Sequence, residues 1–339
     1  MSQTNRQFLL AEIPQGKLGP EHFRLNTAAA PTPGEGEVLL RTRYIALDAA
    51  NRAWMLGQTY RAGLSAGQVM AGAGLCEVVE SRAPGFKPGD IVYADPGWQD
   101  YVALPASQVL ALGQAEPITH LLSVYGTAGL TAYFGLLEIG RPRAGDTVVV
   151  SAAAGAVGLF VGQIAKLKGC RVVGIAGGPE KCAMLTSVYG FDAAVDYKAN
   201  ADNGMALFSA VNAACLGGID VFFDNVGGAI LDTCLFAMKP FGRIVLCGAV
   251  SAYDGGGLPY GVRGLAGAVS KRLLLRGFIV SDFYHGDARD RAIAELRGWV
   301  AEGRIKVRED ILDGFEKLPG ALIGLLAGDN VGKRMVKVA

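Results

Sequence analysis

The stretch Val-Val-Val-Ser-Ala-Ala-Ala-Gly-Ala-Val-Gly, residues 148–158, decides how the middle of this chain folds. Three β-branched residues precede a run of small ones, which is typical of a buried strand that enters a tight turn. Gly155 and Gly158 hold the second and third glycine positions of a G-x-G-x-x-G loop, and Ala153 holds the first. Between a strand and a helix, this spacing indicates a loop that binds the pyrophosphate of a dinucleotide. An ordinary tight turn is the alternative.

The surrounding sequence alternates between strand and helix patterns. The uncharged residues 147–165 approach the length of a membrane span, but a parallel strand buried on both faces is also continuously apolar, so we favour a strand, a turn and a helix. Strands are predicted at 147–150, 171–176, 193–197, 219–224, 242–247 and 273–280, and helices at 157–168, 179–189, 206–215, 229–238 and 288–301. This alternation predicts a doubly wound, mostly parallel α/β sheet.

The pattern before residue 125 is different. Short apolar runs lie between turns rich in glycine and proline, such as 31–37 and 86–90, and predict a β-rich, barrel-like domain. The tail from 305 to 339 ends in a short predicted strand, 334–338, which we expect to return to this first domain.

Composition excludes several classes of function. The chain of 339 residues contains 48 glycines and has a net charge of +1, so nothing favours nucleic acid or an anionic membrane as a partner. The glycine surplus favours tight turns or a backbone that approaches a ligand closely. The six cysteines form no Cys-x-x-Cys pair, and residues 1–17 have no apolar run of signal-peptide length, so we expect a cytoplasmic protein. None of the three histidines lies near a cysteine in sequence, and we expect no metal site.

The end of the second predicted strand indicates which dinucleotide binds. No carboxylate stands at 175–178 to bond a ribose 2′-hydroxyl, whereas Lys181 supplies a positive charge for a 2′-phosphate. We therefore predict NADP(H). The carboxylate of Glu180 argues against NADP(H), unless it instead interacts with the positive N-terminal end of the predicted helix. Lys181 taken alone could also be an ordinary solvated surface lysine.

Three further strand ends carry glycine or polar residues. They are 224–228, 247–251 and 278–281. Ligands of open α/β sheets bind outside the carboxyl ends of the strands, so these segments together outline a cleft. Turn chemistry alone can explain each of them.

The chain resembles a known family across essentially its full length. It is similar to the zinc-independent medium-chain dehydrogenase/reductases, and most similar to the NADPH-dependent alkenal/one double-bond reductases, which include leukotriene/prostaglandin reductases and curcumin reductase. The strings that carry the resemblance are 97–101, 129–133, 153–158, 224–228, 247–253, 277–282 and 328–333.

The resemblance implies a GroES-like catalytic domain over 1–124 and 305–339 and a Rossmann domain over 125–304. It also implies a homodimer joined through the Rossmann sheet edges. Lys181 and Tyr197 would hold the 2′-phosphate, and Tyr253 would lie beside the substrate carbonyl. The cofactor-binding residues expected on these grounds are Thr131, Ala154, Gly155, Ala156, Val157, Gly178, Lys181, Tyr197, Asn225, Cys247, Gly248, Ser251, Phe278, Val280 and Asn330.

The expected reaction is reduction of the carbon–carbon double bond of an α,β-unsaturated aldehyde or ketone. Tyr253 is the catalytic candidate, because its hydroxyl can donate to the oxygen on which negative charge develops. Alternatively, Tyr253 is an aromatic residue that only packs in its loop and has no catalytic role. Trp54 and Tyr60 are the candidates for an apolar substrate pocket, although core or surface packing suits them equally.

The chain departs from the family pattern at some positions, and two rival functions stay open. Gly126-Thr127-Ala128-Gly129 replaces Gly-Met-Pro-Gly, Asp48-Ala49-Ala50-Asn51-Arg52 replaces Asp-Pro-x-x-Arg, and Gly178 stands where a serine is common. These changes affect the substrate assignment more than the cofactor. The rivals are an NADPH quinone reductase and a non-catalytic NADPH-binding protein on the same fold.

Overall fold

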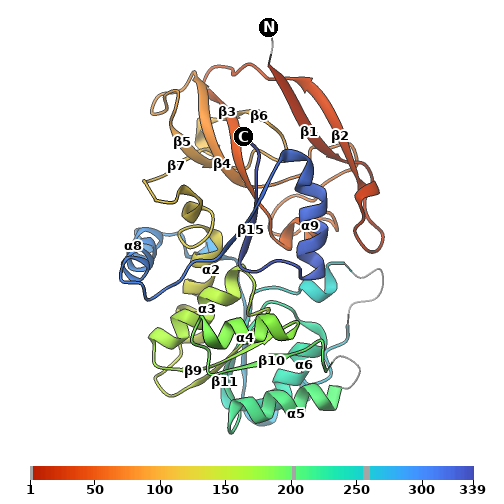
Figure 1. Cartoon of the computed structure of the whole chain (residues 1–339), viewed down its shortest axis with the longest axis vertical. Coiled ribbons are helices and arrows are strands. Elements are labelled where there is room, and N and C mark those ends of the chain that lie inside the picture. The colour runs from red at the N-terminus through yellow and green to blue at the C-terminus, as the bar shows by residue number, and fades with distance from the viewer. Residues whose placement is uncertain (1–2, 201–203, 255–259) are drawn as a thin grey trace. The chain divides into compact units, whose positions relative to one another are not determined.

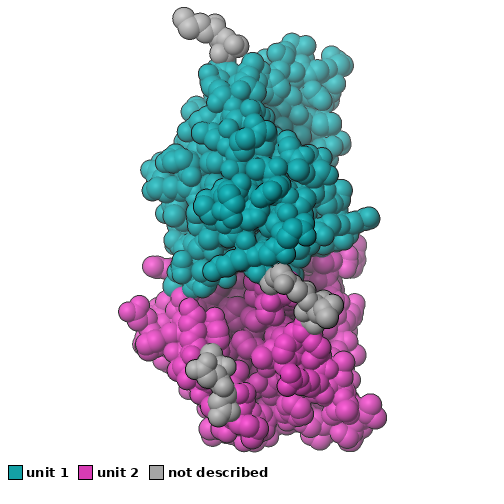
Figure 2. All heavy atoms as spheres, turned by 90° about the vertical axis from the view of Figure 1, so that its right-hand side faces the viewer, with its two compact units in different colours: residues 1–122, 253–256, 309–339 teal, residues 123–252, 257–308 magenta. Residues whose placement is uncertain are grey.

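The computed structural model describes residues 3–200, 204–254 and 260–339. The chain divides into two compact units, coloured separately in Figure 2. Unit 1 comprises Met1–Leu122, Tyr253–Gly256 and Glu309–Ala339, and unit 2 comprises Ser123–Ala252 and Gly257–Arg308. In the division expected from the sequence, Tyr253 and Asp254 fall within the Rossmann domain.

Unit 2 is built on a six-stranded parallel sheet with the strand order β10-β9-β8-β11-β12-β13. This is the Rossmann order, in which the chain reverses its direction of winding between the first and fourth strands, here β8 and β11. The predicted doubly wound sheet is therefore confirmed. The strands are β8 (Thr147–Ser151), β9 (Arg171–Ala176), β10 (Ala193–Asp196), β11 (Ile219–Asp224), β12 (Met238–Leu246) and β13 (Leu274–Gly277).

Helices cover the sheet of unit 2 (Figure 1). They are α2 (Thr127–Phe134), α3 (Ala156–Leu167), α4 (Pro179–Ser187), α5 (Gly204–Cys215), α6 (Gly228–Ala237), α7 (Ala266–Lys271) and α8 (Ala288–Ala301). Every residue of β8 is buried, which explains why the stretch around it carries no charge. Among the helices described, none has the length and apolar character needed to cross a membrane.

Unit 1 is a β-rich domain, as predicted. A two-stranded sheet pairs β1 (Thr4–Leu10) with β2 (Phe23–Ala29), and a second sheet has the order β14-β15-β3-β4-β5-β7, with β6 paired to β3. The strands of the second sheet are β3 (Glu37–Ala46), β4 (Gly74–Ser81), β5 (Ile91–Ala94), β6 (Tyr101–Pro105), β7 (Leu110–Ala111), β14 (Glu309–Asp313) and β15 (Lys333–Lys337).

The C-terminal segment completes unit 1. Figure 1 shows its blue β15 and α9 (Leu318–Ala327) beside the red and orange N-terminal strands, and β15 pairs antiparallel with β3. The core here includes Trp98, which stacks on Phe23 with ring centroids 5.3 Å apart, and Phe8, which stacks on Phe315. Such aromatic pairs contribute beyond the apolar area that they bury.

Two strand predictions differ from the structure at their ends. The strand predicted at 273–280 ends at Gly277, because its partner β12 ends at Leu246, and Val280–Phe283 forms a short 3-10 turn instead. The strand predicted at 242–247 begins earlier, at Met238, which pairs with Ile219 at the start of β11.

Candidate cofactor site and active site

The glycine loop joins β8 to α3 through a sharp turn. Ala152 adopts a left-handed conformation with φ of 47°, and the amide of Ala153 donates to the carbonyl of Ile175 over 3.0 Å. A Cβ atom on Gly158 would lie 2.4 Å from the carbonyl oxygen of Ala152, so only glycine lets α3 pack this closely against the turn. The glycine spacing of the sequence had already placed Gly158 at the third position of this loop.

The N-terminus of α3 has the features of an anion site. No side chain caps the helix, and the amides of its first turn have no partner within it. A Cβ atom on Gly155 would meet only the carbonyl oxygen of Ala152, at 3.1 Å, so space in front of the loop is open. Ala154, Ala156 and Val157 complete the loop. These residues, at the point where the sheet reverses its winding, fit the pyrophosphate of a dinucleotide.

The ends of β9 and β10 form the second part of the candidate site. Gly178, with φ of 93°, begins α4, and Lys181 lies in the first turn of that helix. Tyr197 follows β10 directly, and a Cβ atom on Gly177 would approach the rings and stems of Tyr197 and Lys198 to about 3 Å. Because β9 and β10 are parallel neighbours, Lys181 and Tyr197 belong to the same edge of the sheet.

Asp196 organises this edge and was missed by the sequence analysis. Its carboxylate accepts hydrogen bonds from the amides of Gly178 at 2.8 Å and Lys198 at 2.9 Å. The bond from Gly178 is the largest cause of the lowered pKa of Asp196. The negative charge is thus already engaged by the backbone, which reduces its repulsion of a phosphate at this edge.

A buried carboxylate ties the ends of β8 and β11 together. Asp224 is fully buried, and one oxygen accepts from the hydroxyl of Ser151 at 2.8 Å and from the amide of Val226 at 2.9 Å. The side chain of Asn225 in turn donates to the carbonyl of Ser151 over 2.7 Å. Burial raises the pKa of Asp224, although these hydrogen bonds oppose the shift. The sequence identified Asn225 but not its supports, Ser151 and Asp224.

Backbone hydrogen bonds bring the 247–251 segment to the same place. The amides of Cys247 and Gly248 both donate to the carbonyl of Asp224, at 2.8 and 3.1 Å. The amide and the hydroxyl of Ser251 both donate to the carbonyl of Val226. Asn225, Cys247, Gly248 and Ser251, four of the predicted residues, therefore lie together at the ends of β11 and β12.

Three other predicted residues of unit 2 lie in α2 or directly after β13. The ring of Phe278 meets that of Phe223 edge to face, with centroids 6.5 Å apart, and packs so close to Gly135 that a Cβ atom there would overlap it. Val280 begins the 3-10 turn after β13. Thr131 is buried in α2.

Unit 1 holds the predicted catalytic and substrate residues. The indole nitrogen of Trp54 donates to the hydroxyl of Tyr60 over 3.1 Å. Tyr60 is 57% exposed, and partial burial of its hydroxyl raises its pKa. Tyr253 belongs to the same unit as this Trp54–Tyr60 pair.

The predicted residue Asn330 also belongs to unit 1, where its amide donates to the carbonyl of Gly332 over 2.9 Å. Nearby in sequence, the buried ammonium of Lys333 pairs with Asp48 at 2.6 Å. This ion pair joins the string 328–333 to the string 48–52.

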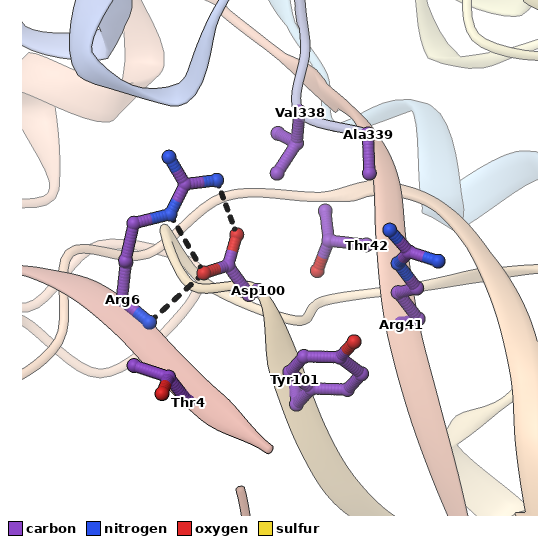
Figure 3. Close-up of a pocket in the computed structure, with 8 residues that line it drawn as sticks. All are labelled: Thr4, Arg6, Arg41, Thr42, Asp100, Tyr101, Val338 and Ala339. Atoms are coloured by element: carbon purple, nitrogen blue, oxygen red, sulfur yellow. Dashed lines mark hydrogen bonds and ion pairs between the residues drawn. The ribbon is translucent and has the colours of Figure 1, made fainter. Parts of the chain in front are cut away.

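A separate hollow of about 290 Å³ lies elsewhere in unit 1 (Figure 3). Arg6 and Asp100 form a two-pronged ion pair there, with both nitrogen–oxygen distances at 2.9 Å. None of the predicted site residues lines this hollow.

Comparison with known proteins identifies the family. A model described as "N-terminal domain of oxidoreductase" matches residues 6–112, and one described as "Zinc-binding dehydrogenase" matches residues 156–296. NADPH-dependent curcumin reductase of Escherichia coli is 43% identical over 99% of this chain and 98% of its own length. The chain belongs to the zinc-independent medium-chain dehydrogenase/reductases, in the alkenal/one double-bond reductase subfamily.

Other members of the family support the same assignment. NADP(+)-dependent 2-alkenal reductase of Nicotiana tabacum is 37% identical and matches 90% of this chain and 88% of its own. The crystal structure of CurA from Vibrio vulnificus, in complex with NADPH, superposes with a TM-score of 0.92 at 41% identity and covers 98% of this chain and 99% of its own. Among the described residues of our reductase, no three His, Cys, Asp or Glu side chains gather as a metal site.

Proposed function

We propose that this protein uses NADPH to reduce the carbon–carbon double bond of α,β-unsaturated aldehydes and ketones. The relatives that match nearly its whole length are reductases that use NADPH or NADP(+), and this carries the proposal. In the balanced reaction, NADPH, a proton and the unsaturated carbonyl compound yield NADP(+) and its saturated product.

The proposed cofactor site lies at the carboxyl ends of the strands of unit 2. The first-turn amides of α3, at Ala156 and Val157, would bind the pyrophosphate together with Gly155. Lys181 and Tyr197 would hold the 2′-phosphate, beside the glycine turn that Asp196 fixes. The open space in front of Gly155 supports this arrangement.

Bound NADPH supplies the hydride that reaches the β-carbon of the substrate. The residues of the chain must then stabilise the negative charge that develops on the carbonyl oxygen. We assign this role to the hydroxyl of Tyr253, which donates a hydrogen bond to that oxygen. Tyr253 or water then supplies the proton that completes the saturated product.

Trp54 and Tyr60 are the proposed substrate contacts. Their rings meet edge to face with centroids 6.5 Å apart, and Arg61 stacks over the Trp54 ring at 4.4 Å. Trp54 is buried and supports the exposed ring of Tyr60, which belongs to the same unit as Tyr253 and offers an aromatic contact for an apolar enal or enone.

A substrate panel tests the function. NADPH oxidation is followed with aliphatic enals, aryl enones and quinones. Turnover of enals and enones supports the proposal. Turnover of quinones alone favours a quinone reductase, and tight NADPH binding with no turnover favours a non-catalytic NADPH-binding protein.

We also propose a homodimer joined through β13, in the cytoplasm. Among the described residues, β13 pairs with β12 alone, so its other edge offers backbone groups to a partner. Leu274 of β13 is an exposed apolar side chain, and so are Phe236 of α6, Phe241 of β12, and Leu265 and Val269 at and in α7. All six cysteines are free thiols, which supports a reducing compartment.

A further inference from the structure

We propose that Arg52 and Asp254 are positioning residues that hold the hydroxyl of Tyr253 in place. This inference rests on the proposed function, in which Tyr253 contacts the substrate carbonyl. Neither residue would touch the substrate. They would act on Tyr253 through the backbone that follows it.

Arg52 lies in the short helix α1 (Ala50–Ala53), and its side chain is 1% exposed. Its Nε atom lies 3.1 Å from Oδ1 of Asp254, and its Nη2 atom donates to the carbonyls of Gly16 at 2.8 Å and Pro14 at 3.4 Å. The Nη1 atom is buried and has no hydrogen-bond partner among the described residues. The planar guanidinium is therefore fixed in orientation.

Asp254 accepts a second hydrogen bond besides the one from Arg52. The same oxygen, Oδ1, accepts the amide of Leu18 over 2.7 Å. One carboxylate oxygen thus connects α1, the 14–18 segment and the residue that follows Tyr253 in the chain. Because the guanidinium is almost completely buried, its charge needs this carboxylate as a counterion.

Tyr253 is anchored on both sides. Upstream, the amide of Ser251 donates to the carbonyl of Val226 at 3.1 Å, and that of Ala252 donates to Ala249 at 2.8 Å. Downstream, Asp254 lies one residue away, and adjacent Cα atoms are about 3.8 Å apart. Fixing Asp254 therefore limits where the Cα atom of Tyr253, the pivot of its side chain, can lie.

Breaking the Arg52–Asp254 ion pair should let the hydroxyl of Tyr253 move away from its position beside the substrate carbonyl. An error of about 1 Å in the placement of a reacting group can cost about a hundredfold in rate. We expect Asp254→Asn to lower kcat about ten- to a hundredfold. The NADPH dissociation constant should stay within about twofold, because no predicted cofactor contact involves Asp254. Arg52→Lys, which keeps the charge but not the planar fork, should retain part of the activity.

A double-mutant cycle tests the proposal. The kcat for an enone is measured for the wild type, Asp254→Asn, Tyr253→Phe and the double variant, with NADPH affinity determined for each. We expect Asp254→Asn to have little further effect once Tyr253 is Phe. Asp100→Asn is the matched control, since it breaks the Arg6–Asp100 pair of the same unit and should leave kcat unchanged. If Asp254→Asn does not fold, Asp254→Glu shifts the carboxylate by one methylene and enters the same cycle.

Three results would overturn the proposal: additive losses in the cycle, an unaltered kcat in a folded Asp254→Asn variant, or an unaltered kcat in Tyr253→Phe. Amide hydrogen exchange over 249–254, without cofactor, gives a readout that does not depend on activity. Faster exchange in Asp254→Asn supports the proposal that the Arg52–Asp254 pair restrains this segment, and unchanged exchange refutes it. A wild type that turns over no enone would refute the proposed function, while the exchange result would still decide whether the Arg52–Asp254 pair restrains the segment.

Discussion

At the scale of the residue, Lys181 should decide which cofactor binds. In the proposed site its charge faces the 2′-phosphate. Replacing it with Gln would remove that charge, and a charged hydrogen bond of about 1.5–3 kcal/mol corresponds to about a ten- to hundredfold loss of NADPH affinity. NADH, which lacks this phosphate, should bind unchanged. Fluorescence titration with both cofactors measures the difference. Lys168→Gln, at the C-terminal end of α3 and away from the glycine loop, is the control. Equal losses for both cofactors would contradict the assignment.

Asp196 should give the stability of unit 2 a pH dependence. Its native pKa is lowered, so its carboxylate stabilises the folded state above the ordinary value of 3.8, and this contribution is lost as the pH falls through the lower native pKa. Urea unfolding of wild type and Asp196→Asn should therefore differ at pH 7 and converge in strong acid. A constant difference across this range would show that the hydrogen bonds to Gly178 and Lys198 do not act through the charge.

A residue can be singled out from the sequence when its signal is local. Gly158 stands out because it follows a recognisable strand at a fixed spacing; Lys181 is singled out in the same way, and its role stays a prediction. Asp224 and Ser151 lie 73 residues apart, and Arg52 and Asp254 lie 202 apart. Each of these looks like an ordinary polar residue in the sequence, and only the fold brings the partners together.

At the scale of the element, the junction of β8 and α3 depends on Gly158. A methyl group there would overlap the backbone of Ala152 and Ala153, so Gly158→Ala should destabilise the protein by about 1–3 kcal/mol and weaken NADPH binding. Gly298→Ala is the matched control, because this glycine of α8 has open space around it and should gain about 0.5–1 kcal/mol in helix stability. Urea unfolding measures both. Equal effects would contradict the packing argument.

The elements themselves were largely predictable because strand and helix patterns repeat strongly in unit 2. The exceptions have physical reasons. The apolar residues after Gly277 extend the strand pattern, but β12 offers no partner beyond Leu246. In the tail, α9 was not predicted, since its long apolar run has no clear polar face.

At the scale of the whole molecule, the exposed edge at β13 should join two copies. Leu274→Lys places a charge on that edge and should convert the dimer to a monomer, because a buried unpaired charge opposes association. Sedimentation velocity measures the mass of both forms. Met205→Lys, which changes an even more exposed apolar residue on α5, should leave the proposed dimer intact. A wild type that sediments as a monomer would refute the proposed dimer.

We expect the reductase to saturate a carbon–carbon double bond and to leave the carbonyl group intact. The most direct test is to incubate the protein with NADPH and an aryl enone and to identify the product by nuclear magnetic resonance. We predict the saturated ketone, formed in equal amount to the NADPH consumed, and strongly reduced formation with Tyr253→Phe. An allylic alcohol as the product, or no product despite bound NADPH, would contradict the account.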